Sequence, residues 1–234
     1  MIWHGSQLTD YAPLLYQGAK TTLRLTGLAL LFGSALGILA GLARSSRVWW
    51  LRLPAMMFIG TFRSIPILLQ LFFAYYGLPL LFNINVPQYA AATLALSVYC
   101  GAYMAEVVRS AVQSVDSGQL AGAAALGLGP VRTFIYVISP QALRVGIPPA
   151  VGVFVMTLKD SSLASVIGYL ELTGTGLAVR EIDPASGSFT VLIAVGGIYF
   201  VCAWLISLCG QYVERRLRIP GMAPAKARPA MTAA

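Results

Sequence analysis

Charged side chains are scarce in this chain of 234 residues. They make up 10% of the sequence, against roughly 25% in an ordinary soluble domain. Hydrophobic residues make up 58%, and the mean hydropathy is +0.76. A soluble fold of this size needs polar side chains to cover its surface, so this scarcity excludes a water-soluble globular protein. Lipid must therefore be the solvent of most of the chain.

Cysteine, histidine and catalytic motifs are also scarce or absent. Cys100, Cys202 and Cys209 sit inside apolar runs without metal-ligand spacing, and we interpret them as small buried side chains. His4 lies in an N-terminal stretch without the basic region and short apolar core of a cleavable signal peptide. No GxxxxGK[ST] phosphate loop, HExxH pair or nucleophile elbow occurs. The sequence therefore predicts that the chain is not itself an ATPase or another enzyme, and that it binds no metal or cofactor.

What the sequence does contain is a series of long apolar runs. A span needs about 20 apolar residues, because the hydrocarbon layer is about 30 Å thick and a helix rises 1.5 Å per residue. A short apolar stretch at 53–62 is interrupted by Arg63 and Pro66, and Pro66 should kink or restart the helix. We therefore predict an all-α membrane protein with five transmembrane helices at 25–43 (extended upstream from 17), 67–82, 89–108, 150–172 and 189–213.

The segments around these spans complete the predicted organisation. We expect a short extracytoplasmic tail at 1–16, a transmembrane domain at 17–213 and a basic, disordered cytoplasmic tail at 214–234. The segments 83–88 and 174–188 are expected to be a turn and a loop. In the first span, Gly33, Gly37 and Gly41 form a GxxxGxxxG row, which predicts close approach of another helix.

Basic residues predict the orientation. The chain has 16 Lys and Arg against 8 Asp and Glu, and because they flank the apolar runs we expect a membrane protein rather than a nucleic-acid binder. If the segments rich in Lys and Arg face the cytoplasm, the N-terminus lies outside. This orientation leaves Lys20 and Arg24 outside, where basic residues are disfavoured, but the reverse orientation would place ten basic residues outside. The segments predicted to face the cytoplasm carry Arg44, Arg47, Arg52, Arg132, Arg144, Arg215, Arg216, Arg218, Lys226 and Arg228.

The segment 117–149 is moderately polar, rich in Ala and Gly, and set between apolar runs. Its stretch 119–128 contains good helix formers, and Gly127, Gly129 and Pro130 should end the helix. Small side chains offer a flat surface to a partner, so we expect a cytoplasmic docking helix. The alternative is a helix lying on lipid, but the Lys and Arg face of such helices is missing.

Three stretches resemble one family: TFRSIPILLQLFFAYYGLP at 61–79, GAYMAEVVRSAVQSVDSGQLAGAAALGLGPVRTFIYVISPQALRVGIPP at 101–149 and TLKDSSLASVIGYLELTGTG at 157–176. They closely resemble permeases of the polar amino acid uptake group of ABC importers, whose members import histidine, arginine, glutamine or glutamate. The resemblance covers 18–213. It implies a type I ABC importer transmembrane domain that pairs with a second permease copy or a paralogue. It also implies two cytoplasmic ATPase subunits that bind ATP and Mg, and an extracytoplasmic binding protein that delivers the amino acid.

By the same resemblance, the helix near 119–127 is the coupling helix that sits in the ATPase, within a coupling segment at about 113–149. The family usually reads GQxEAA here, whereas this chain has Ala121 in place of the glutamate and Gly122 in place of the first alanine. The loss of that carboxylate removes a possible ion pair with the ATPase. The residues implied in coupling are Gly118, Gln119, Ala121, Gly122, Ala123, Leu126 and Gly127.

Ionisable residues inside spans are costly and are therefore candidates for function. Glu106 and Arg109 are three residues apart and share a helix face near the cytoplasmic end of their span. One hypothesis is that Arg63 and Glu106 pair across helices at an inner gate, which re-forms between inward and outward states. The alternative is a static cluster of charges at the membrane interface.

Lys159 and Asp160 lie eleven residues after Pro148, which is about 16 Å along a helix and close to mid-bilayer. An amino acid carries both charges, so a path for it needs complementary groups. The candidates for this path are Gln70, Lys159, Asp160, Ser161 and Ser162. The alternative is that Lys159 and Asp160 neutralise each other or a neighbouring helix and hold the bundle together.

The sequence argues against two other classes of function. An ion-driven secondary carrier would need internal repeats, and five spans cannot form equal halves. An intramembrane enzyme would need a catalytic constellation, and the sequence contains none. The sequence therefore favours the permease.

Overall fold

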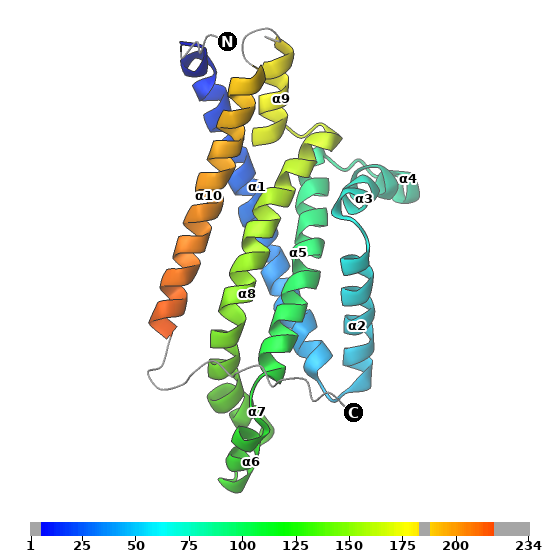
Figure 1. Ribbon diagram of the computed structural model, residues 1–234. Helices are drawn as coiled ribbons and strands as arrows, with labels where there is room; N and C mark the ends of the chain where they lie inside the picture. Colours follow the sequence, from blue (N-terminus) through cyan, green and yellow to red (C-terminus); the bar gives the residue numbers. More distant parts are fainter. Residues whose placement is uncertain (1–5, 183–187, 218–234) are drawn as a thin grey trace, which may run out of the picture.

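The computed structural model describes residues 6–182 and 188–217, and these residues form helices and short connections without a strand (Figure 1). The elements are α1 (Ser6–Ser45), α2 (Trp49–Ser64), α3 (Ile67–Phe72), the π-helical turn η1 (Phe73–Gly77), α4 (Leu78–Phe82), α5 (Gln88–Gln113), α6 (Ser117–Ala125), α7 (Pro130–Thr133), the π-helical turn η2 (Phe134–Ile138), α8 (Ser139–Asp160), the 3₁₀ helix η3 (Ser161–Ile167), α9 (Leu172–Ile182) and α10 (Ser188–Leu217).

The long helices confirm the predicted membrane fold. Four helical stretches are long and apolar enough to cross a bilayer: Tyr11–Ser45, Gln88–Gln113, Pro130–Ile167 and Phe189–Leu217. The pair Trp49–Ser64 and Ile67–Phe82 passes the same test as a unit but is bent by 105°. With this pair counted as one span, the described residues contain the five spans that were expected.

The second span differs in detail from the prediction, which placed it at 67–82 alone. Helix α2 runs along the bundle, and the chain then turns so that α3 and α4 project to one side (Figure 1). Pro66 lies at this bend and cannot donate a backbone hydrogen bond, which explains why the helix stops at Ser64 and restarts at Ile67.

Three other boundaries were wrong. Helix α1 already begins at Ser6, so 6–16, predicted as part of a tail, is helical; residues 1–5 of that tail lie outside the described part. The predicted loop at 174–188 contains most of α9, which ends at Ile182, and residues 183–187 are not described. Helix α10 continues to Leu217, four residues beyond the predicted span, and the rest of the predicted tail, 218–234, also lies outside the description.

The fourth span also differs from its predicted range of 150–172. Helix α8 begins at Ser139, and its α-helical part ends at Asp160. The chain continues as the 3₁₀ helix η3 to Ile167, and Gly168 adopts a left-handed conformation with φ of 80°. Pro148 and Pro149 lie inside α8 and do not end it.

The predicted role of the glycine row is confirmed. We call this contact between α1 and α5 the glycine seam: Gly33, Gly37 and Gly41 facing Cys100, Met104 and Val108. A Cβ atom built on Gly37 would lie 2.5 Å from the Cβ of Met104. Only glycine leaves room for α5 at this separation, so the two helices meet backbone to backbone.

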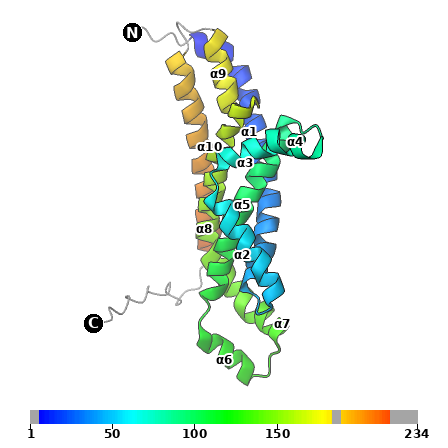
Figure 2. The same ribbon diagram turned by 90° about the vertical axis from the view of Figure 1, so that its right-hand side faces the viewer.

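The described basic residues of the segments predicted to face the cytoplasm gather at one end of the bundle, whereas Lys20, Arg24 and Arg180 belong to the opposite half. The turn between α1 and α2, the helices α6 and α7, and the C-terminal end of α10 all lie at the lower end of Figure 1, whereas the start of α1 and α9 lie at the upper end. In Figure 2, α6 projects beyond the ends of the long helices.

Candidate functional site

A cluster of charges surrounds Glu106 near the lower end of α5. Arg109 lies one turn further along the same helix and donates two hydrogen bonds to the carboxylate of Glu106. Its Nε donates to Oε2 at 3.1 Å, and its Nη2 donates to Oε1. This fork is the geometry in which an arginine binds a carboxylate most strongly. Both oxygens of Glu106 are therefore occupied from within α5.

Two further arginines reach the same carboxylate from other helices. The Nη1 atoms of Arg44, at the end of α1, and of Arg63, at the end of α2, lie 3.5 and 3.7 Å from Oε2 of Glu106. The predicted contact between Arg63 and Glu106 is thus present. The contact of Arg44 with Glu106 was not predicted, because the sequence places Arg44 only in a cytoplasmic turn. The available signal was that Arg44 and Glu106 both lie at the predicted cytoplasmic ends of their spans.

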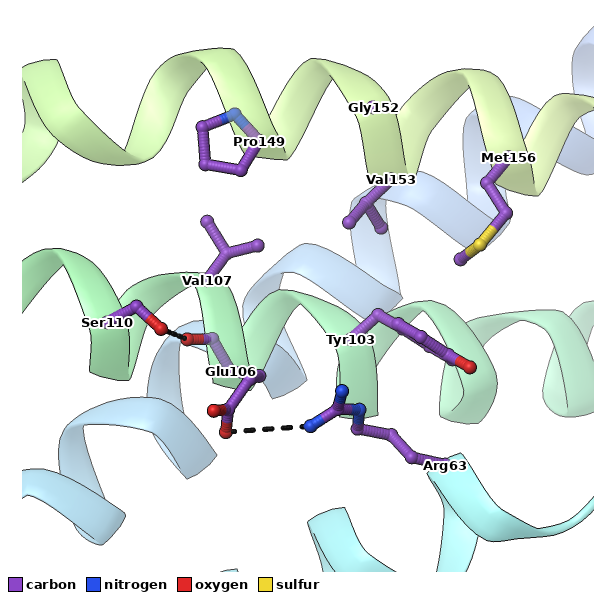
Figure 3. Close-up of a pocket in the computed structure, with 9 residues that line it drawn as sticks. All are labelled: Arg63, Tyr103, Glu106, Val107, Ser110, Pro149, Gly152, Val153 and Met156. Atoms are coloured by element: carbon purple, nitrogen blue, oxygen red, sulfur yellow. Dashed lines mark hydrogen bonds and ion pairs between the residues drawn. The ribbon is translucent and has the colours of Figure 1, made fainter. Parts of the chain in front are cut away.

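The charge cluster borders a cleft between α5 and α8. We call it the inner cleft: a space of about 340 Å³ lined by Arg63, Tyr103, Glu106, Val107, Ser110, Pro149, Gly152, Val153 and Met156. Figure 3 shows Val153 and Met156 of α8 opposite the α5 side chains, with Arg63 entering from α2. The guanidinium of Arg63 also lies 5.2 Å from the ring centre of Tyr103. The cleft therefore combines one charged end with a largely apolar wall.

Lys159 and Asp160 face different surroundings, and no salt bridge joins them among the described residues. Lys159 is exposed and lines a second cleft, of about 440 Å³, with Tyr199 and Trp204 of α10. Asp160 is half-buried, and its Oδ2 atom has no hydrogen-bond partner in the described chain. The alternative that these two residues neutralise each other is therefore wrong for this conformation.

The other residues suggested for the path form local hydrogen bonds. Gln70 is buried, and its Nε2 donates to the carbonyls of Phe62 and Ile65, both at 2.9 Å, which satisfies the backbone where α2 ends. The hydroxyls of Ser161 and Ser162 each donate to a backbone carbonyl three residues earlier. Together with Lys159 and Asp160, the serines cluster at the junction of α8 and η3.

The helix predicted within 119–128 is present as α6, and both of its ends are capped. Asp116 precedes it and accepts a hydrogen bond of 2.7 Å from the backbone N–H of Gly118. At the other end, Gly127 has φ of 71°, and the N–H groups of Gly127 and Leu128 donate to Ala124 and Ala123. This is the Schellman pattern that glycine favours, so the predicted stop at Gly127 is confirmed.

The surface of α6 is made mostly of small exposed groups. Gly118, Gln119, Ala121 and Gly122 are exposed, and no atom lies within 4 Å of a Cβ built on Gly122. Leu126, just after the helix, is 81% exposed, whereas Ala123 is buried against the chain itself. Six of the seven residues suggested for coupling, all except Ala123, are therefore accessible to a partner.

Glu171, which was not among the predicted site residues, forms a buried polar site at the start of α9. Its carboxylate accepts hydrogen bonds from Tyr199 at 2.6 Å, Gly174 N at 2.8 Å, Thr173 N at 3.0 Å and Thr22 at 3.2 Å. An acid inside the predicted span 150–172 was a signal, because ionisable residues in spans are costly.

Comparison with known proteins decides the family. The model of the family described as "binding-protein-dependent transport system inner membrane component" matches residues 33–219. The chain belongs to this family. It is a multi-pass inner-membrane component of a transport system, and the resemblance drawn from its motifs is confirmed.

Relatives and solved structures agree with this assignment. The chain is 38% identical over 211 residues to the glutamine transport system permease protein GlnP of Escherichia coli K12, which covers 88% of this chain and 94% of that protein. It is 35% identical over 210 residues to the L-cystine transport system permease protein TcyB of Bacillus subtilis 168, which covers 89% of this chain and 88% of that protein.

The fold matches that of solved ABC importers. One crystal structure, of an amino acid ABC transporter with histidines, has 33% sequence identity and a TM-score of 0.85, and covers 92% of this chain and 100% of that chain. The inward-facing MetNI methionine ABC transporter shares the fold at 21% identity, with a TM-score of 0.74 and coverage of 90% and 99%. The predicted type I importer permease fold is therefore confirmed.

Proposed function

We propose that this chain is the permease subunit of an ATP-driven ABC importer, which moves a polar amino acid inward by alternating access. The observation that carries the proposal is α6, a capped helix of small exposed residues that projects beyond the bundle. The names of GlnP and TcyB and the amino acid transporter structure support an amino acid as the cargo.

The proposed assembly contains a second permease, either another copy or a paralogue, and two cytoplasmic ATPase subunits. The ATPases bind ATP and Mg and dock on α6 through the exposed coupling residues, while this chain binds no cofactor. An extracytoplasmic binding protein delivers the amino acid at the opposite end. The gathering of basic residues at the α6 end supports a cytoplasmic location for that end and for the C-terminus, with the N-terminus outside.

Ala121 and Gly122 bear on how firmly the ATPase docks. Without the carboxylate usual at position 121, the proposed interface has one possible ion pair fewer. A paralogous permease in a heterodimer would supply the missing contact.

For the transport path, we propose that Arg63 and Glu106 exchange partners as the inner gate opens and closes. The distance of 3.7 Å, longer than the bonds from Arg109, supports a contact that can be broken while Glu106 stays paired. Further along, we place Gln70, Lys159, Asp160, Ser161 and Ser162 beside the path; the unpartnered oxygen of Asp160 supports this.

Reconstitution tests the function as a whole. The permease is expected to co-purify with an ATPase, and proteoliposomes holding the full importer and its binding protein should accumulate an amino acid only with ATP. Uphill accumulation by this chain alone would contradict the proposal and indicate a secondary carrier.

Two substitutions test the path. We expect Lys159→Met and Asp160→Asn to lower substrate-stimulated ATP hydrolysis. Unchanged stimulation in both variants, with normal assembly, would remove these residues from the path.

A further inference from the structure

The charge cluster around Glu106 is unbalanced. Three guanidinium groups, from Arg44, Arg63 and Arg109, converge on one carboxylate, and no other acid of the described chain lies within 4.0 Å of them. Because Arg109 already forms a fork with both oxygens of Glu106, two positive charges remain without a counter-charge of their own. A negative ligand would be stabilised here.

Arg63 is the arginine that is free to bind such a ligand. Its side chain is 40% exposed, compared with 26% for Arg44 and 22% for Arg109. It makes only the 3.7 Å ion pair and the contact with the ring of Tyr103, and it donates no hydrogen bond to a described residue. Its guanidinium can therefore form the bidentate pair that arginine makes with carboxylates.

The inner cleft beside Arg63 has the size and lining of a site for a small amphiphile. Its volume of about 340 Å³ lies at the lower end of the range for small-molecule sites, about 300–1,000 Å³. Val107, Pro149, Val153 and Met156 supply an apolar wall, and Arg63 supplies the charged end (Figure 3). A small molecule that carries a carboxylate and a short aliphatic or polar side chain matches this arrangement, because the carboxylate can pair with Arg63 while the side chain lies against the apolar wall.

The position of the cleft fits the end of the transport path. Glu106 lies seven residues before the end of α5, about 10 Å along the helix, toward the end from which α6 projects. We infer that Arg63 binds the α-carboxylate of the permeating amino acid in the inner cleft, as the last contact before release. This inference rests on the proposed function, because it assumes that the cargo is an amino acid moving toward the α6 end.

The test uses the complete importer in proteoliposomes. Uptake of labelled glutamine, histidine and cystine first identifies an amino acid that the wild type imports. Binding of that amino acid and of its α-carboxamide to the assembled importer without the binding protein is then measured. We expect the carboxamide to bind about tenfold or more weakly, because it cannot pair with a guanidinium as a charged acceptor.

Arg63→Gln is expected to remove this preference, leaving less than about a threefold difference between acid and amide. The variant should fold, because Glu106 keeps Arg44 and Arg109. Arg52→Gln is the matched control: Arg52 is exposed on the same helix and makes no ion pair with a described residue, so the preference should persist. Arg63→Lys should restore part of the preference.

The outcomes separate the inference from the function. If the wild type imports none of the three amino acids, the proposed function fails for these cargoes, and the inference fails with it. If the wild type imports one but Arg63→Gln keeps the preference, or Arg52→Gln loses it equally, only the inference is overturned. It is also overturned if the wild type binds acid and amide equally. If that equal binding depends on the anionic lipid content, a lipid headgroup occupies the cleft instead.

Discussion

The two faces of α5 are built in opposite ways. Toward α1, the glycine seam brings backbones together so closely that even a methyl group would collide. Toward α8, the inner cleft leaves about 340 Å³ beside a charged group. Closely packed contacts move as one body, whereas an open, charged contact can change its partners. The comparison indicates that α1 and α5 form a fixed unit and that movement and ligand contact belong to the α8 side.

The glycine seam provides the strongest test of this division. Gly37→Leu is expected to lower the free energy of unfolding by about 3 kcal/mol or more, because the new side chain collides with Met104. Gly27→Leu on the same helix should have little effect, since nothing lies within 4 Å of a Cβ there. Folded yield and the thermal unfolding midpoint in detergent measure both. Equal losses in the two variants would refute the idea of a fixed seam.

The cap on α9 tests whether the fixed unit extends to the opposite end of the bundle. Glu171→Ala leaves the Tyr199 hydroxyl and two backbone N–H groups without their acceptor, and we expect a loss of about 2–3 kcal/mol. Glu171→Gln should lose less, because it retains an acceptor oxygen. Thermal unfolding and hydrogen exchange of α9 measure the effect. Glu181→Ala, an exposed acid of the same helix, is the control; a similar loss there would argue against a specific cap.

The movable side is tested by a double-mutant cycle. Transport by Arg63→Ala, Glu106→Ala and the double variant should show a coupling of about 1 kcal/mol, because the two side chains form an ion pair. Glu106→Ala should have the larger single effect, because it leaves three arginines without their carboxylate. Strictly additive losses would show that the contact at 3.7 Å carries no energy during transport.

The smallest effect is expected in α6. Gly122→Ala should favour the helix by up to about 1 kcal/mol without changing its packing, and Ala121→Glu restores the carboxylate usual in the family. Both should increase ATPase retention during purification. Gly127→Ala, at φ of 71°, should instead strain the helix end and reduce retention. No change in any variant would indicate that α6 does not limit docking.

Some of the site could be predicted because its members are close in sequence. Glu106 and Arg109 are three residues apart, and the caps of α6 lie within a few residues of the helix. The ion pair between Arg44 and Glu106 could not be predicted from sequence spacing, because it depends on which end of α1 packs beside α5. One alternative for Lys159 and Asp160 was that they neutralise each other. No such pair is present among the described residues, because neighbouring helical residues point in different directions.

By itself, the sequence determined the number of membrane spans, the gathering of the predicted cytoplasmic basic residues at one end and the close contact made by the glycine row. These properties follow from local hydrophobicity, charge and side-chain size. Only the tertiary structure decided the 105° bend after α2, the convergence of three arginines on Glu106 and the burial of Glu171 between α1, α9 and α10. Those features join groups as far as 149 residues apart, and no local pattern specifies which distant surfaces will meet.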